Sequence, residues 1–403
     1  MAVSESPLPV LHPVPGVRIG VVEAAVRKPG VNDLVVMALD EGSRVAGVFT
    51  RNLFRAAPVR LAEANLRDDD PRYLLINTGN ANAGTGQAGD AAVQQNCAAL
   101  AERTGCRPTQ IIPFSTGVIG EPLPADRIDA ALPAAIAGLQ ADHWALAADA
   151  IRTTDTRPKG RSVRLELAAG TITLTGIAKG SGMIRPDMAT MLAYIATDAD
   201  IDTASLRRLL RDAVAVSFNR ITVDGDTSTN DACTLIATAA SGVTLADASE
   251  RARFLDALTT MCVALAREIV ADGEGATRDM AIRVAGATTT AEAEQVAFTV
   301  AESPLVKTAL FAADPNWGRI LAAVGRAGIR DLDVDRVRIH LGDCPIVEGG
   351  GVSPDYRESA AAASMAADHV RIAIDLDRGQ AAATVWTCDF SYDYVRINAE
   401  YRS

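Results

Sequence analysis

The chain has 403 residues, of which 48% are hydrophobic and 22% charged, a composition typical of a folded globular protein with more than one domain. It carries 39 Lys and Arg against 50 Asp and Glu, and the resulting net charge of −11 argues against a general affinity for nucleic acid or anionic membranes. Only 4% of the residues are aromatic, which is few for the stacking surfaces of single-strand binders.

The sequence shows no pattern of a targeting segment or a metal site. No apolar run is long enough to cross a membrane, and the N-terminus lacks the basic and apolar regions of a signal peptide, so we expect a cytoplasmic protein. The six cysteines form no C-x-x-C and the four histidines form no paired motif. We therefore predict neither a metal site nor a cofactor, and no histidine-based triad.

The first part of the chain reads as short apolar strands between turns, followed by helical segments. The predicted strands are 34–37, 45–49, 73–77 and 111–114. A Gly/Asn-rich loop is expected at 78–89, a helix at 90–102, and a turn at 115–117. The alanine-rich stretch 125–154 has a helical pattern interrupted at Pro133, and a hairpin is expected from 163–167 and 171–177.

The second part alternates strands and helices, which indicates an α/β protein. A buried strand is expected at 191–196, and a helix beginning after Asp202 or Thr203 presents one apolar face. A longer helix covers 249–271. Further strands are predicted at 281–284, 296–300, 337–341, 370–374 and 383–386.

The most unusual segment is KGSGMIRPDMATML at residues 179–192, where a glycine-rich turn and a proline lead into a threonine that opens an apolar strand. It does not match a phosphate-binding loop, because its lysine precedes the glycines. A plain turn before a strand and a weak anion nest both remain open on this pattern alone.

This segment resembles the self-cleavage site of the ornithine acetyltransferase (glutamate N-acetyltransferase) family, and the resemblance covers nearly the whole chain. It extends to GVFTRN at 47–52, NTGNANA at 77–83, STGVIG at 115–120, VDGDTSTND at 223–231, DGEGAT at 272–277, DPNWGR at 314–319 and YVRINAEY at 394–401.

The resemblance implies a precursor that cuts itself between Ala189 and Thr190 into chains of residues 1–189 and 190–403. It also implies layered sheets packed between helices, similar to N-terminal nucleophile hydrolases but with their own topology, and an α2β2 heterotetramer. The chemistry agrees, because cleavage frees an α-amine with a reference pKa of about 7.7 to 8.0 beside the Thr190 hydroxyl. One cut would supply both the nucleophile and its base, with no need of a histidine.

The implied reaction moves acetyl from N²-acetylornithine to L-glutamate through an acetyl-Thr190 ester. In the resemblance the Thr116 hydroxyl and the Gly117 N–H stabilise the oxyanion. The substrate-binding residues it implies besides Thr190 are Thr153, Lys179, Glu274, Asn398 and Ser403. By pattern alone, 116–117 is a plain turn, Lys179 and Glu274 are surface charges, Asn398 is a turn residue and Ser403 is a frayed end.

The acidic loop 224–231 offers side-chain oxygens from Asp224, Asp226, Ser228 and Asp231. It lacks the glycine at position six and the glutamate at position twelve of an EF-hand loop, so we do not expect a calcium site. The family resemblance suggests that this loop helps to shape the pocket.

Three questions stay open at the level of the sequence. An aminopeptidase or amidase of related self-cleaving architecture would pass the acyl group to water. A noncatalytic anion-binding protein would use the glycine-rich loops 79–89 and 180–182 and would remain one uncut chain. Acetyl-CoA as a further acetyl donor is compatible with the family but has no sequence signature here.

Overall fold

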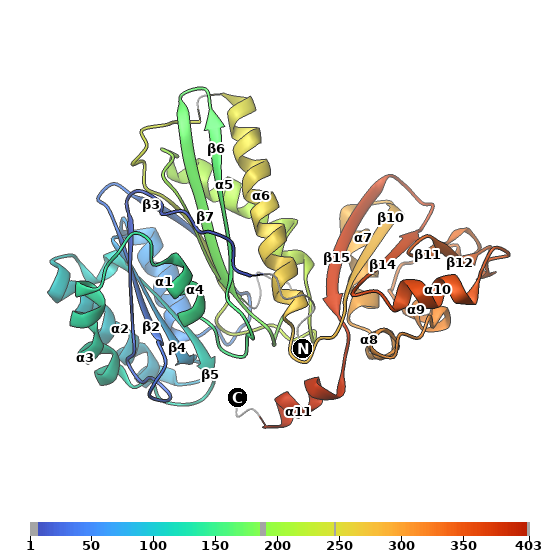
Figure 1. Ribbon diagram of the computed structural model, residues 1–403, viewed down its shortest axis with the longest axis horizontal. Helices are drawn as coiled ribbons and strands as arrows, with labels where there is room; N and C mark the ends of the chain where they lie inside the picture. Colours follow the sequence, from blue (N-terminus) through green and yellow to red (C-terminus); the bar gives the residue numbers. More distant parts are fainter. Residues whose placement is uncertain (1–6, 186–190, 246, 401–403) are drawn as a thin grey trace. The chain divides into compact units, whose positions relative to one another are not determined.

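The computed structural model describes residues 7–185, 191–245 and 247–400 (Figure 1). The chain forms two compact units. The N-terminal unit consists of Pro7–Asn219 and Asp226–Ile269, and the C-terminal unit consists of Arg220–Gly225 and residues 270–400. None of the helices in these residues is long and apolar enough to cross a membrane.

A four-stranded sheet in the order β1-β2-β4-β5 forms one layer of the N-terminal unit. Its strands are β1 (Val17–Val22), β2 (Leu34–Leu39), β4 (Tyr73–Asn80) and β5 (Ile111–Val118). Only β4 and β5 run parallel. One face of this sheet packs against helices, namely α1 (Ala57–Asp68), α2 (Gly86–Thr104) and α3 (Ala125–Ala137).

A five-stranded sheet in the order β3-β9-β8-β7-β6 forms the second layer of this unit. Its strands are β3 (Arg44–Phe49), β6 (Lys159–Leu167), β7 (Gly170–Lys179), β8 (Leu192–Thr197) and β9 (Ala232–Ala237). The predicted hairpin is confirmed as β6–β7, and β8 and β9 run parallel. The predicted cut lies between β7 and β8, which are neighbouring strands of this sheet, so the two predicted chains do not coincide with the two compact units.

The core of the N-terminal unit lies between these two sheets. Its side chains come from both, together with Trp144 of α4 (Trp144–Ala150), and include Ile19, Met37, Ile76, Phe114, Ile177, Tyr194 and Ile236. Helix α5 (Thr203–Ala215) begins at the predicted cap, where the Asp202 side chain accepts a hydrogen bond from the Ser205 N–H. With α6 (Ala248–Ala271) beside β7 (Figure 1), the unit has the predicted layers of sheets packed between helices.

The C-terminal unit contains a six-stranded sheet in the order β13-β12-β11-β14-β10-β15. Its strands are β10 (Asp279–Ala287), β11 (Arg338–Leu341), β12 (Cys344–Glu348), β13 (Gly351–Val352), β14 (His369–Asp375) and β15 (Ala381–Cys388). Its helices are α7 (Thr290–Ala301), α8 (Pro304–Phe311), α9 (Trp317–Gly325), α10 (Glu358–Met365) and α11 (Tyr392–Glu400). Helix α7 packs on β10 and β15.

The predicted strand 296–300 is wrong, because these residues lie in α7. The helix buries Val296 and Val300, four residues apart, together with Ala293, Ala297 and Ala301, and this is helical spacing. The Thr289 side chain caps the first turn by accepting from the Glu292 N–H.

The alanine-rich segment and the loops also differ in part from the prediction. Helix α3 continues through the exposed Pro133 and ends at Ala137, where Gly138 is the C-cap residue. The loop predicted at 78–89 is shorter, because β4 extends to Asn80 and α2 begins at Gly86.

Candidate active site

Thr116 and Gly117 lie inside β5, and not in a turn after it as predicted. Gly117 has φ +136°, and a Cβ there would lie 2.2 Å from the carbonyl carbon of Gly79 on β4. The ladder between β4 and β5 changes register at this point, where Asn80 opposes both Thr116 and Val118. Only glycine fits position 117, so this stretch of backbone is held close against β4.

The side chain of Lys179, at the end of β7, brings two other predicted site residues together. Its Nζ donates to the hydroxyl of Thr116 at 3.1 Å and to the hydroxyl of Thr153 at 3.0 Å. Lys179 is buried, so the interpretation of this residue as a surface charge is wrong. Because an ammonium only donates, both hydroxyl oxygens act as acceptors and keep their own protons for another partner.

Asp155 contacts the backbone next to this cluster, and no sequence pattern indicated a role for it. Its Oδ1 accepts from the backbone N–H of Gly180 at 2.7 Å and from Lys159 Nζ at 2.6 Å. Its Oδ2 accepts from the Thr153 N–H at 3.2 Å. The side chains of Asp155 and Lys159 are both fully buried. One carboxylate thus holds the two backbone segments that carry Thr153 and Lys179.

Two opposing effects act on the pKa of Asp155. Burial alone raises it, but the nearby charges of Lys159 and Lys179 and the hydrogen bonds from Lys159 and Gly180 outweigh burial and hold it well below 3.8. Asp155 is therefore ionised at neutral pH and balances one of the two buried ammonium groups.

The predicted cleavage residues Ala189 and Thr190 lie outside the described residues, and so does Ser403. The chain is described again from Met191, which is buried and whose carbonyl accepts from the Ala232 N–H at 3.0 Å. All residues of β8 are buried, as expected for the predicted strand 191–196.

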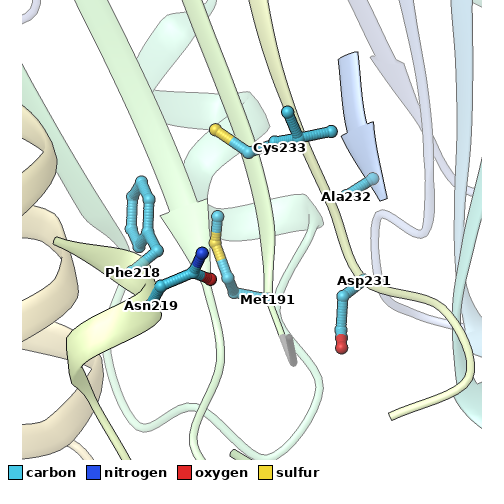
Figure 2. Close-up of a pocket in the computed structure, with 7 residues that line it drawn as sticks. Met191, Phe218, Asn219, Asp231, Ala232 and Cys233 are labelled. Atoms are coloured by element: carbon cyan, nitrogen blue, oxygen red, sulfur yellow. The ribbon is translucent and has the colours of Figure 1, made fainter. Parts of the chain in front are cut away.

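A small pocket opens beside Met191. It has an empty volume of about 190 Å³, part of which is open solvent, and it is lined by Val48, Met191, Phe218, Asn219, Asp231, Ala232 and Cys233. In Figure 2 the side chains of Phe218 and Asn219 lie beside that of Met191. The first residue after Thr190 therefore borders a hollow in the N-terminal unit.

Glu274 and Asn398 belong to the C-terminal unit and contact each other. Asn398 Nδ2, on α11, donates to Glu274 Oε2 at 2.8 Å, and Glu274 is buried while Asn398 is exposed. Glu274 is thus not the surface charge that its pattern alone suggested, and Asn398 lies in a helix and not in a turn. The loop of Glu274 is further held by the Ser391 hydroxyl, which donates to the Gly275 carbonyl at 2.6 Å.

The acidic loop 224–231 is tied to its neighbours by its backbone. The carbonyls of Thr227 and Ser228 accept from Asn52 Nδ2 and from the Thr50 hydroxyl, at 2.9 and 2.8 Å. Across the described ranges, no three or more His, Cys, Asp or Glu side chains are grouped so that they could hold a metal ion.

Comparison with known proteins gives a family match along almost the full length. The model of the ArgJ family matches residues 18–403. The chain is 52% identical to the arginine biosynthesis bifunctional protein ArgJ of Pseudomonas fluorescens (strain Pf0-1) and to that of Pseudomonas syringae pv. tomato, with 100% of each chain covered.

Solved structures of similar proteins match part of the chain. The ArgJ protein of Bacillus halodurans is 40% identical, covers 51% of this chain with 96% of its own, and gives a TM-score of 0.48. The ornithine acetyltransferase of Mycobacterium tuberculosis, solved in complex with ornithine, is 33% identical, covers 44% of this chain with 94% of its own, and gives a TM-score of 0.39.

Proposed function

Since this chain belongs to the ArgJ family, we propose that it is a glutamate N-acetyltransferase that moves the acetyl group of N²-acetylornithine to L-glutamate. The observation that carries the proposal is the meeting of Thr116, Thr153 and Lys179. These residues come from three separate segments, and the buried Lys179 ammonium joins the hydroxyls of Thr116 and Thr153.

The nucleophile in this proposal is Thr190, which becomes N-terminal when the precursor cuts itself after Ala189. Its freed α-amine, with a reference pKa of about 7.7 to 8.0, takes the hydroxyl proton during attack. The Thr190 oxygen then bonds to the acetyl carbon, the amide C–N bond breaks, and the departing ornithine amine takes up the proton. The amine of glutamate reverses these steps on the acetyl-Thr190 ester.

Each half-reaction passes through a tetrahedral oxyanion, for which Thr116 and Gly117 supply the donors. The geometry supports this role because Lys179 donates to the Thr116 oxygen, so the hydroxyl proton of Thr116 is directed elsewhere. Gly117 adds a backbone N–H from a segment that is packed closely against β4. A donor that is fixed before the reaction needs no reorganisation in the transition state.

Substrate recognition needs a cation for the α-carboxylate and an anion for the ornithine ammonium. Lys179 and the Thr153 hydroxyl suit the carboxylate, since an ammonium and a hydroxyl lie within 3.0 Å of each other there and both can donate hydrogen bonds to it. Glu274 and Asn398 are proposed for the ammonium, and Ser403 is proposed to close the site. The use of acetyl-CoA as a second donor and the α2β2 assembly are further parts of the proposal.

The test is a transfer assay with N²-acetylornithine labelled in its acetyl group. With L-glutamate present, we expect labelled acetylglutamate and ornithine to form in equal amounts, as measured by mass spectrometry. Labelled acetate in place of acetylglutamate would show a hydrolase of the aminopeptidase or amidase kind. Absence of both products would refute the proposed function, provided that the preparation is folded.

A further inference from the structure

We propose that Asn230 is a positioning residue that fixes the oxyanion-stabilising stretch of β5 relative to the strand that follows Thr190. The inference rests on the proposed function, because it concerns how Thr116 and Gly117 are held for that reaction. It also assigns a role to the loop 224–231, for which the sequence suggested only a contribution to the shape of the pocket.

The amide of Asn230 joins the residue that follows β4 to the middle of the parallel strand β5. Its Nδ2 donates to the carbonyl of Ala81, directly after β4, at 2.6 Å and to the carbonyl of Ser115, on β5, at 2.9 Å. Asn230 is buried. A primary amide has two N–H groups, so one side chain binds both carbonyls, which flank the residues where the β4–β5 ladder changes register. Ser115 precedes Thr116, and its carbonyl is therefore part of the peptide unit that supplies the Thr116 nitrogen.

The orientation of this amide is set by its own loop. Its Oδ1 accepts from the Thr229 hydroxyl at 2.6 Å, and its backbone N–H donates to the Ser228 hydroxyl oxygen at 3.1 Å. The carbonyl of Thr229 accepts from the Ala56 N–H at 2.9 Å. The amide is thus held from both ends before any substrate arrives, which is what preorganised positioning requires.

The same short segment also reaches the strand of the nucleophile. Two residues after Asn230, the Ala232 N–H donates to the carbonyl of Met191, the residue that follows Thr190. From there β9 runs parallel to β8, with Ala232 opposite Leu192. Asn230 therefore contacts β5 at Ser115, next to Thr116, and Ala232 contacts Met191, which follows Thr190. A shift of this segment would change how Thr116 and Gly117 lie relative to Met191, the residue that follows Thr190.

Asn65 provides a matched control at the opposite end of the same strand. It is a buried asparagine whose Nδ2 donates to two backbone carbonyls, that of Ile111 at 2.7 Å and that of Pro108 at 3.4 Å. Ile111 is the first residue of β5, whereas Ser115 lies next to Thr116. Asn65→Ala removes the same kind of interaction from β5 but leaves the stretch around Thr116 tied by Asn230.

The experiment compares Asn230→Ala with Asn65→Ala and the wild type in acetyl transfer from N²-acetylornithine to glutamate, with rates expressed per mole of cleaved chain. We expect both variants to lose a similar amount of thermal stability. We expect kcat to fall by about 10- to 100-fold in Asn230→Ala with little change in KM, since a misplacement of about 1 Å costs rates of this order. Asn65→Ala should stay within about twofold of the wild type.

Asn230→Ser provides a second variant, because its hydroxyl can still donate one hydrogen bond, and its kcat should lie between those of Asn230→Ala and the wild type. The inference is overturned if Asn230→Ala matches Asn65→Ala in kcat at equal stability. It is also overturned if KM rises while kcat is unchanged, which would place Asn230 in substrate binding. A wild type that transfers no acetyl would instead refute the proposed function.

Discussion

Asp155→Asn is the substitution whose effect follows most directly from the site. The change keeps the size of the side chain but removes the charge that faces Lys159 and Lys179. It removes the carboxylate that contacts the fully buried Lys159 ammonium at 2.6 Å. It also weakens the hydrogen bond from the Gly180 N–H, which is now made to a neutral oxygen or lost.

The expected loss is large because both charges are buried. Breaking a buried ion pair by removing one partner costs about 3 to 5 kcal/mol of unfolding free energy, since an uncompensated charge is left inside. An exposed pair in the same unit, Arg60 with Asp90, is the matched comparison, with side chains 45% and 43% exposed. Asp90→Asn should cost less than about 1 kcal/mol, because solvent screens the pair.

The assay is urea unfolding of the wild type, Asp155→Asn, Asp90→Asn and the double variant Asp155→Asn/Lys159→Met at pH 7. The double variant removes both charges of the pair, so it should recover part of the loss seen in Asp155→Asn. A loss below about 1 kcal/mol in Asp155→Asn, or a double variant less stable than Asp155→Asn, would refute the reasoning.

The contribution of Asp155 to the stability of the protein depends on pH in a definite direction. The pKa of Asp155 is lower in the folded protein than its ordinary value of 3.8, so its contribution to stability is fully present above about pH 5 and is lost as the pH falls through 3.8 toward the folded pKa. The stability gap between wild type and Asp155→Asn should therefore be constant from pH 5 to 7 and narrow in acid. A gap that widens below pH 4 would contradict this assignment.

Three further substitutions test single features of the site. Thr116→Val should lower kcat by about 10²- to 10³-fold through the loss of one oxyanion donor, and steady-state kinetics that show a change in KM alone would contradict that role. Gly117→Ala should prevent normal folding, because its Cβ would lie 2.2 Å from the Gly79 backbone. Gly105 also has a positive φ, but a Cβ there would meet no atom within 4 Å, so Gly105→Ala is the control. If circular dichroism shows a folded Gly105→Ala and an unfolded Gly117→Ala, the cause is the close contact and not the positive φ alone. Glu274→Gln should raise KM for N²-acetylornithine about tenfold or more through the loss of a charged hydrogen bond, while intact mass shows unchanged cleavage; an unchanged KM would remove Glu274 from recognition.

Helices and strands could be predicted wherever their buried residues form a clear apolar pattern in the sequence. Strands such as β2 and β8 are buried along their whole length and appear in the sequence as short apolar runs. The segment 296–300 has the same composition, but its partners Ala293 and Ala301 lie outside the short window, and only the longer window shows helical spacing. Composition in five residues cannot separate a buried helix from a buried strand.

The site was less predictable, because its contacts join distant parts of the chain. Lys179 and Thr116 are 63 residues apart and come from different sheets, so only the family resemblance placed them together. Asp155 carried no signal, and Asn230 was marked only as part of the loop 224–231, since these side chains bind backbone groups 25 and 115 residues away. Backbone acceptors and donors are present at every position, and a sequence does not mark which of them a side chain will reach.

The central claim, that Thr190 becomes the nucleophile when the chain cuts itself, is tested most directly by intact mass under denaturing conditions. We predict two wild-type species, one ending at Ala189 and one beginning at Thr190, and a single full-length species for Thr190→Ala. A wild-type preparation that transfers acetyl to glutamate while every chain remains uncut would contradict the account, because Thr190 would then act without a free amine.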